Sequence, residues 1–412
     1  MVSDLRALPR SFWVLFAGTF INRFGTFVWP FLTIYLTHQG HTLAEAAWAI
    51  SGFGGGAIFG GALGGWLSDH IGRRNTIVIG TFSNAASVML LYTASSFPAI
   101  VAGAALVGLA SGTYQPAASA LLADIVPSAL HVRAYSALRL AANAGFAGGV
   151  SLGGLLATHS LFWLFAGDAL TTAIYGVIAL LWLPHGLRAQ TKNAPWSDAF
   201  SALKRDRAFH ALWVAAFCSA LVFSQFGTTY SVSILRRGLT LDAFGFHLAP
   251  ETVYGVLMAW NGVLIVFTEL PLTSLTLRFD SRRVMALGYV LIGFGFALNG
   301  WCHSIATLYL AMTIFTVGEM ISAPNMSAVV ARLAPERLRG RYMGVLMLAW
   351  NASAVLGPQF GLRLFALDPR FVWFGCLALG LTAAATTLAF GKSAMLQAGK
   401  PERVEEPDSV EV

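Results

Sequence analysis

Charged residues are scarce in this chain. Asp, Glu, Lys and Arg make up 11% of its 412 residues, whereas soluble domains carry about 25%. Hydrophobic residues make up 56%, and the mean hydropathy is +0.67. A water-soluble fold could not carry this much apolar surface, so the composition predicts an integral membrane protein.

Cysteine is also rare, and several catalytic motifs are missing. Cys218, Cys302 and Cys376 stand alone in apolar segments without C-x-x-C spacing, so we expect no disulfide, no metal site and no cofactor. The sequence has no H-E-x-x-H motif of zinc proteases and no P-loop lysine for ATP-driven pumping. "FAGD" at 165–168 lacks the first glycine of the G-x-G-D motif of intramembrane aspartyl proteases. We therefore assign no catalytic residue and expect that the protein is not an enzyme.

Long apolar runs are what the chain has instead. A membrane-spanning helix needs about 20 largely apolar residues. The runs that meet this requirement are 11–36, 44–68, 76–95, 98–124, 132–157, 160–183, 208–235, 250–277, 283–302, 304–331, 342–366 and 370–391. The predicted fold class is an all-α membrane protein with twelve transmembrane helices.

Arginine and lysine gather in alternate loops. The basic loops on one side contain Arg6 and Arg10, Arg73 and Arg74, Arg133, Arg188 to Arg207, Arg278 to Arg283, Arg332 to Arg341, and Lys392 to Arg403. Because cytoplasmic loops carry the excess of these residues, we expect both termini in the cytoplasm and the chain in a plasma membrane, the inner one of a bacterium. The net charge of +7 then reflects topology and contact with the lipid bilayer, and it requires no nucleic-acid partner.

The chain repeats itself at an offset of 208 residues. The pairs that match between residues 116–154 and 324–361 are Pro116 with Pro324, Pro127 with Pro335, Arg133 with Arg341, Asn143 with Asn351, Gly149 with Gly357, and Gly153 with Gly361. "FGT" at 24–26 also returns at 226–228. Six spans per repeat make the two halves parallel, related by an axis along the membrane normal. We therefore expect two six-helix halves at 1–183 and 208–391, a cytoplasmic linker at 184–207 and a disordered tail at 392–412.

A charged turn interrupts the apolar sequence between the second and third runs. "GGWLSDHIGRRNTI" at 64–77 matches the pattern G-x-L-x-D-[RH]-x-G-R-[RK] at Gly65, Leu67, Asp69, His70, Gly72, Arg73 and Arg74. The two six-helix halves, the linker and this turn together resemble the major facilitator superfamily. The resemblance covers essentially the whole chain. The equivalent "LRFDSRR" at 277–283 keeps only the two final arginines.

The turn is expected to act as a conformational latch. Asp69 ends helix 2 and Arg73 begins helix 3, so each charge opposes the dipole of its own helix and needs another partner. Asp124, at the end of helix 4, is well placed for Arg73, and the resemblance implies the N-terminus of helix 11 near Gly340 for Asp69. The expected latch residues are Gly65, Asp69, Gly72, Arg73, Arg74 and Asp124. The alternative is a topological signal combined with a tight turn.

Helix 5 is rich in glycine. "NAGFAGGVSLGG" at 143–154 resembles the antiporter signature of the drug-efflux branch at Gly145, Gly149, Gly153 and Gly154, although Val150 replaces its proline. Glycine at every fourth position also lets helix backbones approach closely. The alternative is therefore tight packing of helix 5 on helix 8, and of helix 11 on helix 2.

Five ionisable residues fall at membrane depth: Arg23, Arg139, Asp168, Glu269 and Glu319. Each costs at least ~2.5 kcal/mol on insertion scales, so a functional role is the default expectation. We expect Glu319 first, Glu269 second and Asp168 third as proton carriers, although Glu319 could instead only hydrogen-bond the helix near Pro324. Arg23 could pair with Asp168 or with a Glu across the cavity, and Arg139 is shallow enough to snorkel.

Polar and aromatic residues share these helices and suggest a substrate cavity. The expected cavity residues are Asn22, Arg23, Tyr114, Gln115, Asn143, Gln225, Trp260, Asn261, Asn325 and Asn351. Aromatic walls with a few acids suit an amphipathic organic solute, with organic cations among the candidates. We expect a monomeric secondary transporter that moves a small molecule by proton-driven efflux. The alternative is proton-linked uptake or facilitated exchange of a sugar, peptide or metabolite.

Overall fold

The computed structural model describes residues 8–127, 130–185, 204, 206–243, 246–276, 278–302, 304–333 and 339–398. In that part of the chain, 11 helices are long and apolar enough to cross a membrane. The remaining predicted span, the first, is broken into α2 (Arg10–Phe24) and α3 (Val28–His38). The chain is therefore a multi-pass, all-α membrane protein, and the predicted fold class is confirmed.

The other elements follow the predicted spans closely. The first half contains α4 (Leu43–His70), α5 (Arg73–Thr93), α6 (Phe97–Ile125), α7 (His131–His159) and α8 (Leu161–Trp182). The second half contains α10 (Arg207–Phe223), η2 (Phe226–Tyr230), α11 (Ser231–Arg236), α12 (Pro250–Thr276), α13 (Ser281–Leu298), α14 (Ile305–Leu333), α15 (Arg339–Leu367) and α16 (Pro369–Ala398).

Two features of the structure differ from the sequence-based expectation. A small antiparallel hairpin of β1 (Leu241–Ala243) and β2 (Phe246–Leu248) joins α11 to α12. Helix α16 continues to Ala398, seven residues into the predicted tail, because "KSAMLQA" contains mostly good helix formers. Most of the predicted linker (186–203 and 205) and residues 399–412 lie outside the described residues.

Spans 1 and 7 both depart from α-helical geometry at the repeated "FGT" motif. Gly25 ends α2, and a Cβ at this position would overlap the Thr171 side chain of α8. In span 7, residues 226–230 form the π-helix η2, and the Gln225 side-chain oxygen accepts hydrogen bonds from Thr228 at 3.3 Å and Thr229 at 3.1 Å. Single π-helical turns of this kind are frequent at functional sites.

The helices pack as two equivalent bundles, which we call the first bundle (α2 to α8) and the second bundle (α10 to α16). The pairs α5 with α6, α5 with α8, and α2 with α7 in the first bundle correspond to α13 with α14, α13 with α16, and α10 with α15 in the second. Between the bundles, α7 packs on α12 and α4 packs on α15. These are the expected contacts of helix 5 with helix 8 and of helix 2 with helix 11. The two contacts are equivalent, because the repeat relates helix 5 to helix 11 and helix 2 to helix 8.

Glycines bring particular helices into close contact. A Cβ at Gly149 of α7 would overlap the carbonyl of Phe24 at the end of α2, and Gly145 faces the same turn. Of the helix 5 glycines, Gly154 is the one that faces α12, near the Glu251 backbone. The glycine stripe of helix 5 therefore mainly accommodates the break in helix 1, and the expectation that it serves packing on helix 8 holds only at Gly154.

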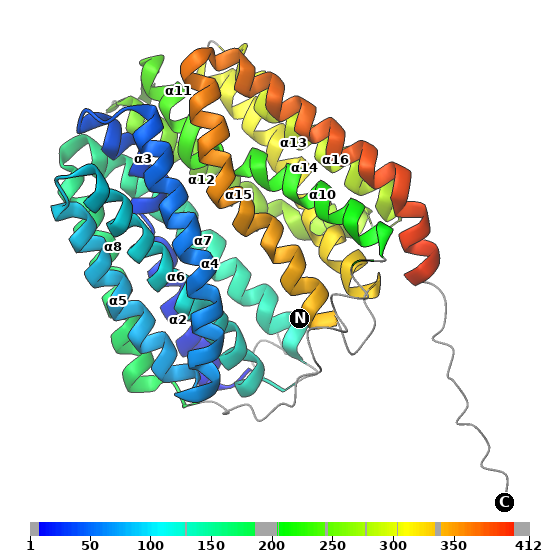
Figure 1. The fold of residues 1–412 in the computed structure, drawn as a ribbon, viewed down its shortest axis with the longest axis horizontal. Helices are drawn as coiled ribbons and strands as arrows, with labels where there is room; N and C mark the ends of the chain where they lie inside the picture. The colour runs from blue at the N-terminus through cyan, green and yellow to red at the C-terminus, as the bar shows by residue number, and fades with distance from the viewer. Residues whose placement is uncertain are drawn as a thin grey trace, which may run out of the picture.

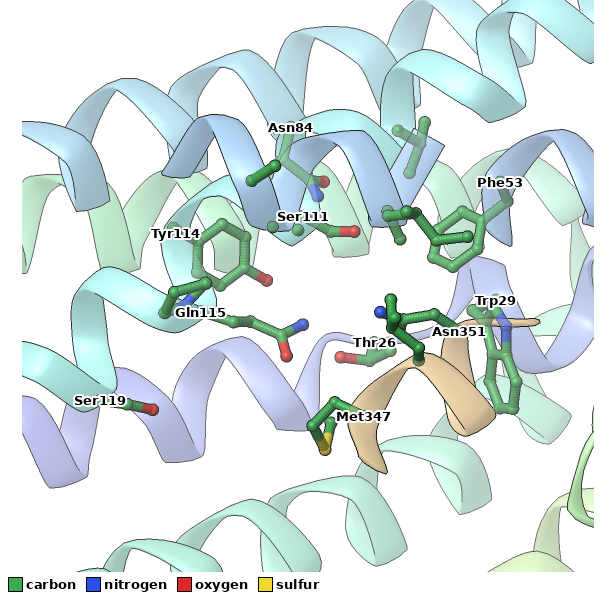
Figure 2. A pocket seen from close by; sticks show the side chains of 18 of the residues that line it. Thr26, Trp29, Phe53, Asn84, Ser111, Tyr114, Gln115, Ser119, Met347 and Asn351 are labelled. Atoms are coloured by element: carbon green, nitrogen blue, oxygen red, sulfur yellow. The ribbon is translucent and has the colours of Figure 1, made fainter. Parts of the chain in front are cut away.

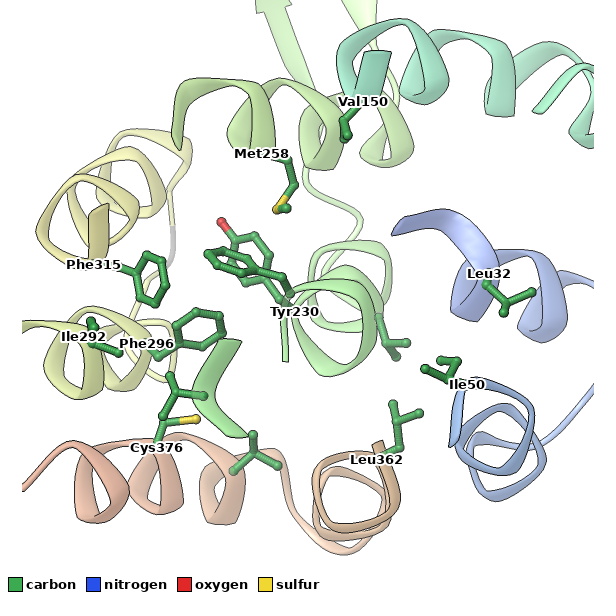
Figure 3. Close-up of a cluster of buried hydrophobic side chains, with 14 of the residues drawn as sticks. Leu32, Ile50, Val150, Tyr230, Met258, Ile292, Phe296, Phe315, Leu362 and Cys376 are labelled. Atoms are coloured by element: carbon green, nitrogen blue, oxygen red, sulfur yellow. The ribbon is translucent and has the colours of Figure 1, made fainter. Parts of the chain in front are cut away.

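The two bundles join at the end of the molecule that carries the hairpin, which we call the hairpin end. Thr33 donates a hydrogen bond to the Gly227 carbonyl at 2.6 Å, and the Tyr254 hydroxyl donates to the Pro30 carbonyl at 3.1 Å. The apolar core runs across this junction, where Ile50 of α4 lies beside Leu362 of α15 (Figure 3).

The opposite end, which carries the arginine-rich loops and is called here the basic end, is different. A second buried cluster there, from Leu8 and Phe12 to Leu183, consists of first-bundle residues. The bundles diverge from the hairpin end, where α3 and α11 lie, toward the basic end (Figure 1). The fold thus closes at one end and leaves space between the bundles at the other.

Candidate functional site

A cavity of about 1370 Å³ occupies this space. It extends from Val28 at the start of α3 to His210 and Gly344, which lie near the basic ends of α10 and α15. The expected cavity residues that line it are Asn22, Arg23, Tyr114, Gln115 and Asn351. Tyr114, Gln115 and Asn351 face one another across it, with Phe53, Trp29 and Met347 as apolar wall (Figure 2).

A second cavity of about 330 Å³ lies toward the second bundle. Asn143, Asn261 and Glu319 line it as expected. Its other walls are largely aromatic and aliphatic: Phe223, Phe226, Met258, Ile265 and Trp350. Trp29, Phe53 and Phe146 line both cavities, so the two adjoin through an aromatic boundary.

Three residues expected in the cavity line neither of these two. Gln225 is buried and bonds within span 7 and toward the Gly357 carbonyl of α15 at 3.4 Å. The Trp260 ring nitrogen donates to Thr313 of α14 at 2.9 Å, and the Asn325 amide donates to the Ile321 carbonyl of its own helix at 2.9 Å. Gln225 and Trp260 thus bond to a neighbouring helix and Asn325 to its own, and none of the three lines either cavity. Their expected role in the substrate cavity stays a prediction.

Asp168 holds the two pieces of helix 1 in place. One carboxylate oxygen accepts hydrogen bonds from the backbone N–H of Phe27 at 3.2 Å and of Val28 at 3.0 Å. Both groups lie at the N-terminus of α3, where N–H groups have no partner within the helix and a negative charge is stabilised. The Phe27 N–H also donates to the Gly25 carbonyl at 2.7 Å. Thr172 donates to the other oxygen at 3.5 Å. An acid on α8 therefore caps a helix that starts about 140 residues earlier in the chain.

Arg23 lines the larger cavity without a partner. Within the described part of the chain its side chain makes neither an ion pair nor a hydrogen bond, and the expected pair with Asp168 is not formed. Its neighbour Asn22 is fully engaged, donating to Thr172 and accepting from Tyr114, each at 3.0 Å. The hydrogen bonds of Asn22 are thus satisfied, while the guanidinium of Arg23 pairs with no residue in the part of the chain that the structure describes.

Arg139 links the two bundles through acidic residues. Its guanidinium, on α7, forms an ion pair with Glu269 on α12. It is also close enough to Glu319 on α14 for the two charges to interact. Glu319 accepts a hydrogen bond from Asn261 at 3.0 Å. One cation of the first bundle thus faces two carboxylates of the second, an arrangement that no spacing in the sequence reveals.

The charged turn at the basic end forms a network within the first bundle. Arg73 contacts Asp69 at 2.6 Å and, as expected, Asp124 at 3.3 Å. Gly72 has φ of 91°, a conformation that favours glycine. Among the described residues, Asp69 makes no hydrogen bond or ion pair with α15. The side chains at the start of α15, around Gly340, lie outside the described part of the structure. Its role as a latch stays a prediction.

Sequence comparison gives the family. The model of the Major Facilitator Superfamily matches residues 15–250 and 242–410. The chain belongs to this superfamily. Together with the membrane-spanning helices and the cavity between bundles, this makes it a membrane transporter of small molecules and not an enzyme.

Relatives with known names lie at moderate to low identity. The chain is 30% identical to the uncharacterized MFS-type transporter YttB of Bacillus subtilis (strain 168), covering 93% of this chain and 96% of that protein. It is 24% identical to a Na⁺, Li⁺, K⁺/H⁺ antiporter of Planococcus maritimus, covering 89% and 90%. It is 25% identical to the multidrug resistance protein MdtH of Yersinia pestis (strain Pestoides F), covering 92% and 94%.

A solved structure shares the fold. The crystal structure of a peptide transporter POT in complex with sulfate superposes with a TM-score of 0.78 at 16% sequence identity, covering 95% of each chain. At this identity the likeness shows the architecture alone.

Proposed function

We infer that this transporter exports a small amphipathic organic solute in exchange for protons. The observation that carries the proposal is the pair of carboxylates, Glu319 and Glu269, that share one cation across the interface between bundles. Glu319 also lines a cavity, so a proton could reach it. Relatives named as a proton antiporter and as a multidrug resistance protein support the same direction of transport.

Proton binding would act on the contact between bundles. An ionised Glu319 attracts Arg139 of the first bundle, and protonation removes this attraction without breaking the Glu269 pair. A proton therefore changes the relative stability of the two conformations, which is what coupling requires. The outward state would load the proton, and the state open at the basic end would release it.

The basic end faces the cytoplasm in this proposal. Its loops carry the arginine and lysine residues that favour the cytoplasmic side. The cavity then opens to the cytoplasm and the hairpin end is closed, so the structure represents the state that collects solute for export. The protein would act in the plasma membrane as a monomer, with each chain containing a complete cavity.

A neutral substitution at Glu319 tests the coupling. Proteoliposomes with an acidic interior would be offered ethidium, N-phenyl-1-naphthylamine or 1-anilinonaphthalene-8-sulfonate as cationic, neutral and anionic probes. The wild type should accumulate at least one of them against its gradient. Glu319→Gln keeps shape and hydrogen bonding but cannot titrate, so it should lose this accumulation and keep probe exchange at equal pH.

Glu45→Gln is the matched control. Glu45 closes the capping box of α4 with Thr42 and lines neither cavity, and glutamine also serves in a capping box. This variant should accumulate the probe as the wild type does. If Glu319→Gln and Glu269→Gln both retain full gradient-driven accumulation, the assignment of these carboxylates is wrong.

A further inference from the structure

Among the described residues that line the larger cavity, basic side chains outnumber acidic ones. Arg23, Lys204 and His210 are its basic lining residues, and Asp168 is its one acidic residue among those described. Lys204 and His210 are exposed at the mouth, whereas Arg23 lies near the middle of the molecule, one residue before α2 ends. The balance of charge at depth therefore depends on Arg23 and Asp168.

Asp168 does not neutralise Arg23. Its carboxylate is occupied by the backbone N–H groups of Phe27 and Val28 and by the Thr172 hydroxyl. The positive pole of the α3 N-terminus balances its charge locally. Arg23, in contrast, makes no side-chain hydrogen bond or ion pair within the described residues. Charged side chains that face a cavity at membrane depth pair with other groups or mark the path of a substrate or ion, and a ligand that supplies an anion would pair with this guanidinium.

We propose that Arg23 binds the carboxylate or sulfonate group of an amphipathic organic anion. Guanidinium binds such planar or tetrahedral oxyanions through paired, charge-assisted hydrogen bonds. Gln115 and Asn351 point into the same space (Figure 2) and can donate further hydrogen bonds. This assignment replaces the cationic solute that the sequence suggests.

The apolar part of the solute would lie against the aromatic boundary of the two cavities. Trp29, Phe53 and Phe146 form this boundary and bury an aromatic or aliphatic body. The cavity volume of about 1370 Å³ exceeds the ~300–1,000 Å³ typical of small-molecule sites, so a ring system with one acidic group fits easily. Lys204 at the mouth would raise the local concentration of anions.

This inference rests on the proposal that the cavity takes an organic solute, but it does not require proton coupling. Equilibrium binding at one pH therefore tests it separately from the Glu319 experiment. The full-length protein in phosphatidylcholine nanodiscs would be titrated with 1-anilinonaphthalene-8-sulfonate and with N-phenyl-1-naphthylamine, which has the same ring system without the sulfonate. Empty nanodiscs provide the background for both probes.

Arg23→Gln should weaken sulfonate binding at least about tenfold, which corresponds to about 1.4 kcal/mol, and change the Kd of the neutral probe by less than about twofold. Arg23→Lys keeps the charge but cannot make the paired hydrogen bonds, so it should weaken sulfonate binding by less than Arg23→Gln does. Arg10→Gln removes a charge from the exposed start of the same helix and should have no effect on either probe. Monodispersity and Tm of each variant establish that it is folded.

The outcomes separate the two proposals. Unchanged sulfonate affinity in Arg23→Gln, or equal weakening of both probes, overturns the anion site and leaves the transport proposal standing. Equal effects of Arg10→Gln and Arg23→Gln would mean that a general field attracts the anion, which also overturns a specific site. If the wild type does not bind the sulfonate probe saturably, the anion site is overturned, and the transport proposal is decided separately by the proteoliposome experiment, in which ethidium is also offered.

Discussion

Among the individual residues, Arg139 is the one whose interpretation changes most between the sequence and the structure. Its position in the sequence suggests a side chain that reaches the membrane surface, yet it pairs with Glu269 and acts on Glu319. Arg139 and the two acids come from three helices in two bundles, so their proximity depends on long-range packing. The sequence indicates that each charge is functional, because each is costly at its depth, but it cannot indicate which charges meet.

Opposite shifts of the transport pH profile are expected when Arg139 and its ion-pair partner Glu269 are neutralised one at a time. Glu269→Gln leaves the whole Arg139 charge to stabilise ionised Glu319, so gradient-driven transport should move to lower pH. Arg139→Gln removes that stabilisation and should move it to higher pH. Each shift should be about one pH unit, equivalent to about 1.4 kcal/mol. Initial rates between pH 5 and 9 give the midpoints, and shifts in the same direction would refute this electrostatic link.

Among the elements, helices 1 and 7 show what the repeat means. The recurrence of "FGT" marks both positions where the helix departs from regular geometry. The sequence does not predict the break itself, since residues 11–36 form one apolar run. The break depends on Asp168, which caps α3, and on the close approach of Gly25 to Thr171. Both partners lie on α8, beyond the reach of a local pattern.

Close packing of α4 on α6 depends on glycine, and two adjacent glycines allow a matched comparison. A Cβ at Gly56 would overlap the Ala105 carbonyl of α6, whereas a Cβ at Gly55 meets nothing within 4 Å. Gly56→Ala should therefore destabilise the fold by about 1–3 kcal/mol through overpacking. Gly55→Ala should be neutral or stabilising by up to about 1 kcal/mol, because alanine favours the helix.

Thermal unfolding in detergent, followed by tryptophan fluorescence, distinguishes the two variants. The expected order of Tm is Gly55→Ala at or above the wild type and Gly56→Ala several degrees below it. Equal Tm values would show that α4 and α6 can separate at no cost, contrary to the contact seen between them.

In the whole molecule, the sequence predicts the architecture better than the cavity. The twelve spans follow from the lengths of the apolar runs, and the two parallel repeats follow from matches at one offset. Neither property of the sequence depends on how the helices pack. Whether a polar side chain faces the cavity depends on the rotation of its helix. The sequence places Gln225, Trp260 and Asn325 in the cavity, but in the structure Gln225 and Trp260 bond to neighbouring helices and Asn325 bonds to a carbonyl of its own helix. Arg23 does line it, and only the assembled bundles reveal that none of the described residues pairs with it.

The direction of proton movement during solute transport shows whether the protein exchanges solute for protons. Proteoliposomes would contain the pH indicator pyranine and a transported probe, with equal pH and equal potassium on both sides and valinomycin to clamp the membrane potential. Efflux of the probe down its own gradient should acidify the interior, because each outward step of an antiporter brings protons in. Glu319→Gln vesicles should release the probe without this acidification. An interior that turns alkaline, or that stays at constant pH while the wild type releases the probe, would contradict proton-coupled export.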